Sequence, residues 1–306
     1  MHHVIRLVVR VGVLLSAALP LRAQNTDSIA AYTAAQCPSC AEWNAAAKPV
    51  RLFGNAYYVG TRGLSAILLT SPQGHVLLDA GLPESAPLIA ANVRALGFRV
   101  EDIELIVNSH SHYDHAGGIA SLQRWSGASV AASPASAPVL RTGIAGRDDP
   151  QYGPRMLPHP GASNVRVIAD GDTLRVGPIE IVAHFTPGHT RGGTSWSWRS
   201  CDAGDCVTFV YADSQTPVSD DNFLFTRNTA YPTVLSDFER GFAVLERLTC
   251  DVLVTPHPGA SRLWERLDAR DRGDPAALRD RDACRKYAAN ARQALARRVA
   301  QESSSR

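Results

Sequence analysis

The sequence predicts an α/β fold in which two mixed sheets pack face to face with helices on the outside. Short apolar runs rich in branched residues recur along both halves of the chain, and helical segments follow them in each half. Metal-capable side chains come directly after several of these runs. Because α/β folds usually place their chemistry in loops that leave strand ends, stacking the two halves would bring these loops to one edge.

The first residues have the pattern of a secretory signal peptide. A basic stretch at 1–10 precedes a short apolar core at 11–21, and Ala23 offers a small residue for cleavage. The apolar core is too short to span a bilayer, so we do not expect a membrane anchor. No cysteine follows it closely, which argues against a lipoprotein. We therefore predict a signal peptide at 1–23, a single catalytic domain at 24–306 and a periplasmic location.

Short strands are predicted from residue 51 onward, with turns such as Pro72-Gln73-Gly74 between them. Residues 24–50 have little periodicity and are expected to form a mobile arm. The last of these strands ends at Asp79, whose carboxylate at the mouth of a buried strand must be hydrogen-bonded. It could support a neighbouring metal loop or, equally, cap a helix or turn. The strands cover residues 51–53, 56–59, 65–70 and 75–78.

The segment His110-Ser111-His112-Tyr113-Asp114-His115 follows a strand predicted at 103–107 and holds four metal-capable side chains. Residues 110, 112 and 114 alternate, so an extended backbone would aim them to one side. His115 breaks the alternation, and Gly117-Gly118 supplies the freedom to turn. This pattern favours two adjacent metal ions, and imidazole and carboxylate ligands suit zinc. The alternative is a polar surface loop with scattered histidines, but such loops rarely place four metal-capable side chains within six residues.

The remaining segments alternate between predicted strands and helices. Residues 133–163 are rich in proline and loop-like, and a long irregular stretch in a compact enzyme often borders a substrate site. Further strands are expected at 179–183, 194–198, 207–211 and 251–255, and helices at 84–96, 119–125, 236–248 and 275–300.

Two further histidines follow strands in the second half. His189 stands on the Pro187-Gly188 turn, and His257 follows the strand at 251–255. Each histidine alone is weak evidence for a metal site. Together with the cluster at 110–115, however, they supply the two ligands that this cluster lacks. Six ligands would give three per metal, with room for a bridging water. The other histidines lack this pattern, and His184 among them is interpreted as structural; they are His2, His3, His75, His159 and His184.

Six cysteines in a chain with an export signal indicate disulfides, although six can pair in fifteen ways and the sequence alone does not choose among them. Cys201 and Cys206 flank a turn-like segment, so we expect them to brace a hairpin. Cys37-Pro38-Ser39-Cys40 has the spacing of a redox motif but lacks its strand–helix context, and we interpret it as a small structural loop. Cys250 and Cys284 would tie the last strand to the C-terminal helix.

The composition argues against nucleic-acid binding. The 306 residues carry 31 Lys and Arg against 29 Asp and Glu, a formal net charge of +2, without a basic stripe. The arginines of the C-terminal third alternate with acids and are typical of a solvated helix surface. We expect a monomer that acts on a small molecule.

These motifs resemble the metallo-β-lactamase superfamily, and in particular its subclass B3. The resemblance rests on His-x-His-x-Asp-His at 110–115, the Pro-Gly-His turn and the late histidine at a strand end, and it covers nearly the whole mature chain. It implies an αβ/βα sandwich. Supporting stretches are Asn55-Ala56-Tyr57-Tyr58-Val59-Gly60-Thr61, Thr186-Pro187-Gly188-His189-Thr190, Tyr211-Ala212-Asp213-Ser214 and Thr255-Pro256-His257-Pro258-Gly259-Ala260-Ser261.

The resemblance implies two zinc ions per chain. Some relatives have glutamine at the position of His110, so the histidine here implies a complete first site. Subclass B1 enzymes use a cysteine ligand where subclass B3 enzymes have a serine that does not bind metal directly, and Ser214 matches that serine. The first zinc would be held by His110, His112 and His189, and the second by Asp114, His115 and His257.

The same resemblance suggests substrate contacts and disulfide partners. Ser214 and Thr216 would lie near the substrate carboxylate, and Gln151 at the edge of the site. The pair Cys250–Cys284 matches a disulfide typical of subclass B3. A related variant has a cysteine where Arg62 stands here, so Cys37 lacks that partner and a local bond to Cys40 is expected.

The implied reaction is hydrolysis of the lactam amide of penicillins, cephalosporins and carbapenems, which would confer antibiotic resistance. Zinc lowers the pKa of bound water from about 16 to about 7, so a hydroxide oriented by Asp114 could attack the carbonyl. One alternative is another dinuclear hydrolase of this fold, a lactonase or glyoxalase II-like thiolesterase, with Asp213 bridging the metals. A second alternative is a non-catalytic zinc-binding protein, which open three-ligand sites disfavour.

Overall fold

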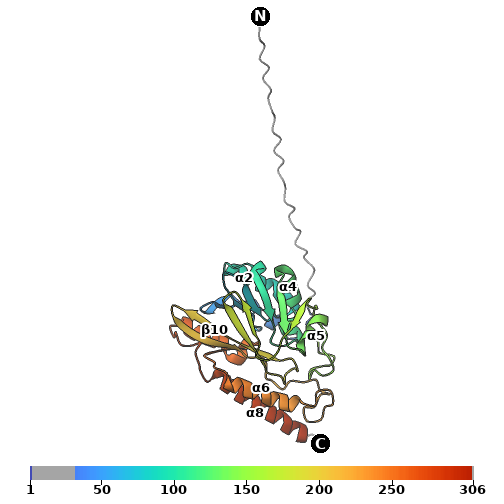
Figure 1. Cartoon of the computed structure of the whole chain (residues 1–306). Coiled ribbons are helices and arrows are strands. Elements are labelled where there is room, and N and C mark those ends of the chain that lie inside the picture. The colour runs from blue at the N-terminus through green and yellow to red at the C-terminus, as the bar shows by residue number, and fades with distance from the viewer. Residues whose placement is uncertain (2–31, 305–306) are drawn as a thin grey trace.

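The fold is described by a computed structural model that covers residue 1 and residues 32–304. Most of the predicted signal peptide, residues 2–23, and the beginning of the predicted arm lie outside the described residues. Two sheets form the centre of the molecule, with helices against both outer faces (Figure 1). None of the described helices is long and apolar enough to cross a membrane.

The first sheet has seven strands in the order of the chain, from β1 to β7. Strands β1 to β4 are joined by antiparallel pairing, whereas β4 to β7 pair in parallel, so the sheet is mixed. Its strands are β1 (Val50–Phe53), β2 (Ala56–Tyr58), β3 (Ile67–Leu69), β4 (His75–Leu78), β5 (Ile103–Val107), β6 (Ser129–Ala132) and β7 (Val165–Val167).

The second sheet has five strands in the order β12-β11-β10-β9-β8. It is mixed as well, because β12 pairs with β11 in parallel and the other pairs are antiparallel. Its strands are β8 (Thr173–Val176), β9 (Ile179–Phe185), β10 (Thr194–Asp202), β11 (Asp205–Tyr211) and β12 (Val252–Val254).

Alternating side chains divide the apolar residues of each strand between two layers. Ile67 and Leu69 of β3 join the core between the sheets, whereas Leu68 faces the helices outside the first sheet. In β11, Phe209 packs into the central core and Val210 faces the helices outside the second sheet. Because successive strand residues point to opposite faces, strands buried on both faces have the unbroken apolar runs seen in the sequence.

The outer helices complete a four-layer αβ/βα sandwich, which confirms the predicted fold. Helices α2 (Ala86–Ala95), α4 (Ile119–Ser126) and α5 (Ser136–Thr142) pack on the first sheet. Helices α6 (Val234–Arg247) and α8 (Ala283–Ser304) lie side by side against the second sheet (Figure 1). The remaining helical segments are α1 (Cys40–Trp43), η1 (Pro83–Ser85), η2 (Val100–Asp102), α3 (Tyr113–Ala116), η3 (Pro258–Ser261) and α7 (Leu263–Asp271).

The structure corrects two predicted segments. The last helix begins at Ala283 rather than near 275, because the N–H of Asp280 is bonded to the Asp251 carbonyl and holds the preceding segment beside β12. The described part of the predicted mobile arm packs on the domain, with N–H groups of Arg62 and Gly63 bonded to its carbonyls. Long-range contacts of this kind leave no periodic pattern in the sequence.

The structure forms three disulfides from the six cysteines, with the pairing expected above. Cys201–Cys206 closes the β10–β11 hairpin, and Cys250–Cys284 joins the segment before β12 to the start of α8. Cys37–Cys40 lies at the start of α1.

Candidate metal centre

The six predicted ligands come from three loops that leave carboxyl ends of strands. His110 to His115 follow β5, His189 follows β9, and His257 follows β12. Since β5 lies in the first sheet and the other two strands in the second, no single segment of the chain could assemble this group. The packing of the two sheets brings the loops together.

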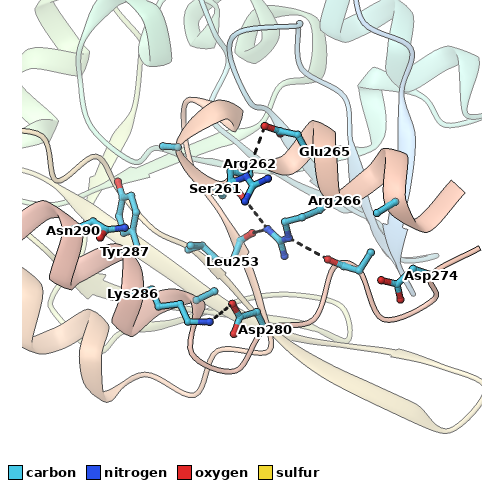
Figure 2. A pocket seen from close by; sticks show the side chains of 14 residues that line it. Leu253, Ser261, Arg262, Glu265, Arg266, Asp274, Asp280, Lys286, Tyr287 and Asn290 are labelled. Atoms are coloured by element: carbon cyan, nitrogen blue, oxygen red, sulfur yellow. Dashed lines mark hydrogen bonds and ion pairs between the residues drawn. The ribbon is translucent and has the colours of Figure 1, made fainter. Parts of the chain in front are cut away.

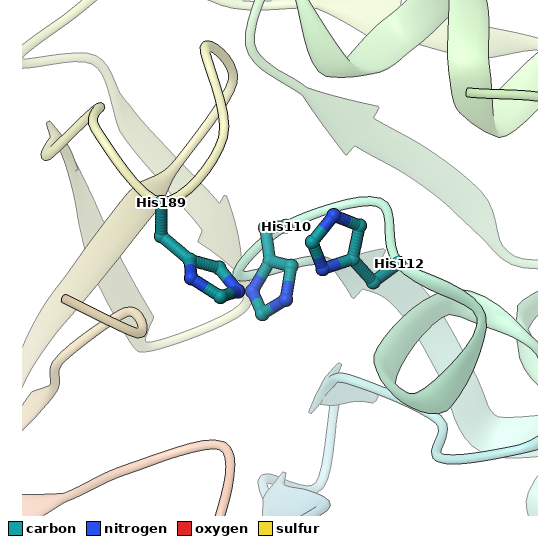
Figure 3. Close-up of side chains that lie close together, drawn as sticks. All are labelled: His110, His112 and His189. Atoms are coloured by element: carbon teal, nitrogen blue, oxygen red, sulfur yellow. The ribbon is translucent and has the colours of Figure 1, made fainter. Parts of the chain in front are cut away.

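One compact group consists of His110, His112 and His189. One potential ligand atom from each lies within 4.8 Å of the others, and all three side chains are buried. Figure 3 shows the three rings approaching one another from two different loops. The ring centroids are 4.7 to 5.1 Å apart, which is the crowding expected around a small shared cation.

A second group gathers around the carboxylate of Asp114. His110, Asp114 and His115 meet the same 4.8 Å criterion. His257 joins them, since its Nε2 lies 3.3 Å from Asp114 Oδ2, and His115 Nε2 lies 3.2 Å from the same oxygen. The structure therefore brings together all six predicted ligands in two adjoining groups.

The backbone of the central loop differs from the prediction. Tyr113–Ala116 form one helical turn, so Asp114 and His115 are presented from a helix rather than from an extended chain. Gly117 and Gly118 have ordinary right-handed helical angles and do not use the conformational freedom of glycine. Glycine is required there by close packing, because a Cβ on Gly118 would lie 2.3 Å from the carbonyl oxygen of Ala80.

The imidazoles of the first group each make one short hydrogen bond to the protein, through a single ring nitrogen. His110 Nδ1 donates to Asp213 at 2.8 Å, His112 Nε2 to Asp149 at 2.9 Å, and His189 Nδ1 to the Thr216 carbonyl at 2.8 Å. The opposite nitrogen of each ring is then unprotonated, as a metal ligand must be. His110 Nε2 is buried without a hydrogen-bond partner, which fits a bound metal ion.

Asp79 supports this loop from below. Its carboxylate accepts bonds from the Asn108 amide at 3.1 Å, from the Ser109 N–H at 2.7 Å and hydroxyl at 2.6 Å, and from the Tyr211 hydroxyl at 2.8 Å. Of the two roles left open by the sequence, the structure selects support of the metal loop. The first three of these bonds fix the two residues immediately before His110.

The electrostatics favour the protonation state that a metal needs at three of the ligands, whereas at His112 and His257 burial is outweighed by neighbouring carboxylates, which raise the pKa. Burial lowers the pKa of His110 well below 6.5 and that of His189 to about 3, and neighbouring imidazoles add to both shifts. Burial alone would raise the pKa of Asp114, but His115 and His257 outweigh it and hold that pKa well below its usual range. At neutral pH, His110 and His189 are thus neutral and Asp114 is ionised, so a metal ion could bind them without displacing a proton.

The predicted substrate residues lie beside the first group. Gln151 Nε2 is 3.4 Å from His112 Nδ1 and from His189 Nε2. Thr216 contacts His189 through its carbonyl, and Ser214 is buried two residues before it. Asp213 Oδ1 lies 2.8 Å from His110 Nδ1, and its other carboxylate oxygen is buried without a hydrogen-bond partner.

Sequence reasoning missed several supporting groups. Asp149 bonds His112, although no motif marks it as the partner of that ligand. His159 lacks the ligand pattern, yet its Nε2 lies 3.2 Å from the Ser111 carbonyl between two ligands. Trp43 packs its ring 5.2 Å from that of His257. None of these positions carries a local signal, because each contact spans distant parts of the chain.

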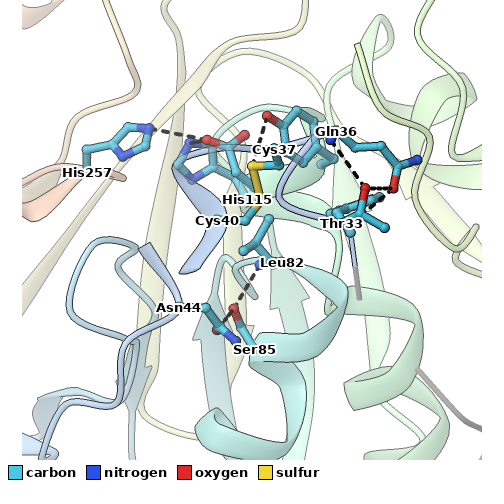
Figure 4. Close-up of a disulfide and its surroundings, with 12 residues drawn as sticks. Thr33, Gln36, Cys37, Cys40, Asn44, Leu82, Ser85, His115 and His257 are labelled. Carbon is cyan, nitrogen blue, oxygen red and sulfur yellow. Dashed lines mark hydrogen bonds and ion pairs between the residues drawn. A yellow bond between two sulfur atoms is a disulfide. The ribbon is translucent and has the colours of Figure 1, made fainter. Parts of the chain in front are cut away.

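The segment around the first disulfide forms a wall of the centre. Figure 4 shows the Cys37–Cys40 disulfide close to His115 and His257. Cys37 Sγ lies 3.8 Å from the hydroxyl of Tyr113, and the ring of Trp43 lies 5.2 Å from that of His257. The part of the chain predicted as an arm therefore shapes the side of the centre that faces the second group.

A separate cleft of about 590 Å³ lies between η3, α7 and α8 (Figure 2). Its central cation, Arg266, donates to the carbonyls of Leu253, Ser261, Ala277 and Leu278. Lys286 pairs with Asp280 across the cleft. Arg266 and Lys286 are thus already bonded to protein groups, and none of the six predicted metal ligands lines the cleft. We therefore interpret the cleft as a packing gap between η3, α7 and α8 rather than as a binding site.

Comparison with known proteins agrees with the geometry. The model for the metallo-beta-lactamase superfamily matches residues 59–199. Among solved structures, Rm3 metallo-beta-lactamase is 54% identical with a TM-score of 0.85, over 87% of this chain and 99% of that chain. MEM-A1, a subclass B3 metallo-beta-lactamase from a soil metagenome library, is 46% identical with a TM-score of 0.84, over 86% and 100%.

Curated relatives match over shorter stretches. A human protein named metallo-beta-lactamase domain-containing protein 1 is 30% identical over 131 residues, and hydroxyacylglutathione hydrolase of Salmonella typhi is 32% identical over 127 residues. These matches cover 42% and 41% of this chain, and the chain spans only about two fifths of each relative, 40% and 39%. The two sheets, the two adjoining ligand groups and the nearly complete overlap with Rm3 and MEM-A1 show that this chain belongs to the metallo-β-lactamase superfamily, within subclass B3.

Proposed function

We propose that this protein hydrolyses the amide bond of the β-lactam ring in penicillins, cephalosporins and carbapenems, and so confers antibiotic resistance. The observation that carries the proposal is the pair of adjoining ligand groups that share His110, with Asp114 ionised between them. The similarity to Rm3 and MEM-A1 over nearly their full lengths supports the same chemistry here.

The donor set fits two zinc ions. His110, His112 and His189 would hold the first, and Asp114, His115 and His257 the second. Three protein ligands per metal leave a position open, as in catalytic rather than structural zinc sites. When bound there, zinc would supply a nucleophilic hydroxide at neutral pH and a Lewis acid for the carbonyl oxygen.

The residues of the chain have distinct tasks in this reaction. Asp114 is buried and ionised, so its carboxylate can accept a hydrogen bond from the attacking water and orient it toward the lactam carbonyl. Gln151, whose Nε2 lies 3.4 Å from His112 Nδ1 and His189 Nε2, would contact substrate at the edge of the first group. Ser214 and Thr216 would receive the carboxylate that lies next to the lactam nitrogen. This arrangement needs no serine nucleophile.

The second candidate is a glyoxalase II-like thiolesterase, favoured by the partial match to hydroxyacylglutathione hydrolase. That match covers 39% of the relative, whereas the β-lactamase matches cover 99% and 100% of theirs. The role of Asp213 also differs from that of the bridging aspartate expected in this alternative, because its carboxylate is bonded to His110 Nδ1.

We also propose export to the periplasm and action as a monomer. The pairing of all six cysteines in disulfides supports an oxidising compartment, where such bonds persist. Fractionation of cells that produce the full-length chain, with mass measurement of the mature protein, tests both the location and cleavage near residue 23. Light scattering of the purified protein tests the monomer.

The test of function is turnover of a carbapenem by the purified protein, before and after treatment with a zinc chelator. We expect hydrolysis that the chelator abolishes and added zinc restores. Parallel assays with a glutathione thioester address the second candidate. Thioester cleavage without carbapenem cleavage, in a protein that holds two zinc ions, would overturn the proposal in favour of the thiolesterase.

A further inference from the structure

A fully buried glutamine, Gln215, lies between Ser214 and Thr216. Its side-chain Nε2 donates to the Thr186 carbonyl at 3.0 Å and to the Ser214 carbonyl at 2.9 Å. Burying an amide costs free energy unless its hydrogen bonds are made, and the Oε1 of this amide is buried without a partner. A glutamine in such a place therefore calls for a role that an apolar residue could not fill.

The bond from Gln215 to the Thr186 carbonyl joins the two loops on either side of His189, and the bond to the Ser214 carbonyl lies within its own loop. Thr186 starts the turn that carries His189, and the carbonyl of Thr216, the residue after Gln215, accepts the His189 Nδ1–H at 2.8 Å. A proton on Nδ1 leaves Nε2 with the free electron pair that a metal requires. The position of the Thr216 carbonyl thus decides which nitrogen of His189 can bind metal.

Helix α6 locks the glutamine in place. A Cβ on Gly241 of this helix would lie 2.8 Å from Gln215 Oε1 and 3.0 Å from the Pro187 carbonyl oxygen. The helix backbone therefore approaches both the amide and the turn as closely as a glycine permits. The packed helix therefore closes the Oε1 side of the Gln215 amide.

The same network reaches His110. The Thr186 hydroxyl lies 2.8 Å from the Ser195 hydroxyl, and Ser195 Oγ accepts the Asp213 N–H at 2.9 Å. Asp213 in turn bonds His110 Nδ1. Thr186, Ser195, Asp213 and Gln215 have no exposed surface, so this chain of bonds lies entirely in the interior.

We propose that Gln215 is a positioning residue for the first metal site: it ties the loop that carries Thr216 to the Thr186 carbonyl, keeps the Thr216 carbonyl against His189 Nδ1, and so selects the Nδ1–H tautomer of His189. The inference rests on the proposed metal site and assigns a role to a residue that no motif indicated. Outer partners of this kind change metal affinity by about 10- to 100-fold when they are removed.

The test compares the wild type with Gln215→Met, which keeps the length of the side chain and removes its amide. Two-dimensional ¹⁵N NMR of the histidine rings in the metal-free protein should show a single Nδ1–H tautomer of His189 in the wild type and a mixture in the variant. Zinc titration against a competing chelator should show first-site affinity lowered on the order of 10- to 100-fold, with the second site unchanged.

Gln123→Met is the matched control. Gln123 is also buried, and its Nε2 donates to the carbonyls of Ala128 at 3.2 Å and Ser163 at 2.7 Å, away from every ligand. We expect this variant to lose stability but to keep the His189 tautomer and both zinc affinities. If Gln215→Met fails to fold, Gln215→Asn supplies the same comparison, since the shorter amide cannot span the distance to Thr186.

The proposal is overturned if the Gln215 variant keeps the Nδ1–H tautomer and wild-type zinc affinity, or if both glutamine variants weaken zinc binding equally. Failure of the proposed reaction would look different. A protein that does not hydrolyse β-lactams could still show the tautomer and titration results, because neither measurement uses a substrate.

Discussion

At the scale of single residues, each histidine of the first group uses one ring nitrogen to bond the protein and presents the other to the metal site. His110, His112 and His189 each make one short hydrogen bond to the protein, and the partners are two carboxylates and one main-chain carbonyl. These outer bonds set the ring orientation before any metal arrives. Substitutions of the ligands and of their partners should therefore have different consequences.

Replacement of Asp114 by asparagine should lower kcat for carbapenem hydrolysis by about 10²- to 10⁴-fold, the usual contribution of a positioned acid–base group. The amide cannot take a proton and is a poorer metal ligand, so second-site zinc content should fall as well. Steady-state kinetics and metal analysis measure both effects. Asp271→Asn, at an exposed aspartate of α7, is the control. An Asp114→Asn enzyme with wild-type kcat would contradict the assigned role.

Replacement of Asp213 by asparagine should weaken the first zinc site by about 10- to 100-fold and spare the second. The reason is that Asp213 bonds only His110 among the ligands, at 2.8 Å. Zinc titration against a chelator measures the two affinities. A bridging aspartate, as in the thiolesterase alternative, would instead weaken both sites together.

At the scale of elements, close backbone packing holds the ligand loop. In Gly118→Ala the new methyl group would meet the Ala80 carbonyl oxygen at 2.3 Å, so the loop or β4 must shift. We expect a loss of about 1–3 kcal/mol, typical of overpacking. Urea unfolding in the presence of chelator measures it without a contribution from metal. Gly259→Ala is the control, because a Cβ on Gly259 would have nothing within 4 Å and its φ is not left-handed.

The two disulfides of the second half should differ in their contribution to stability. Cys250–Cys284 closes a loop with a sequence separation of 34, and Cys201–Cys206 one of 5. Loop-closure entropy then gives roughly 4 kcal/mol for the first and roughly 2 kcal/mol for the second. Paired Cys→Ser variants compared by urea unfolding test the order. A larger loss for the hairpin disulfide would show that chain entropy is not the governing factor.

At the scale of the whole molecule, the C-terminal helix holds the loop that follows the predicted substrate residues. Glu302 of α8 accepts the N–H groups of Phe225 and Thr226 at 3.0 and 2.9 Å, and Arg298 bonds the same carboxylate at 2.8 Å. Burial would raise the pKa of Glu302, but Arg298 and these donors outweigh it and lower the pKa below 4.5.

A lowered folded-state pKa means that Glu302 stabilises the fold above its unfolded pKa and loses this effect as pH falls through the folded value. Glu302→Gln should therefore cost about 1–3 kcal/mol at pH 7, since charged hydrogen bonds are weakened. The difference from the wild type should shrink below pH 4.5. Urea unfolding at a series of pH values measures it, and a difference independent of pH would refute the charge-based explanation.

The sequence by itself determined the ligand types, the family resemblance and most of the described strands, but not β6, β7 and β8. The run at 103–107 could be recognised as a strand because it is short and rich in branched apolar residues, and four of its five residues are buried. The spacing of 110–115 is likewise a local pattern that can be read without the fold. The histidines at 189 and 257 could be recognised as ligands because the cluster at 110–115 supplies only four of the six ligands that two metal ions need.

Tertiary structure alone decided how the ligands are held. Asp149, Asp213 and Gln215 bond or frame His112, His110 and His189 across separations from 26 to 103 residues, and no periodic or motif pattern records such contacts. The helical turn at Tyr113–Ala116 and the packing of the described part of 24–50 were likewise decided by neighbours distant in the chain. Side-chain hydrogen bonds depend on which loops the two sheets bring to one edge, and that is settled only when the sheets have packed.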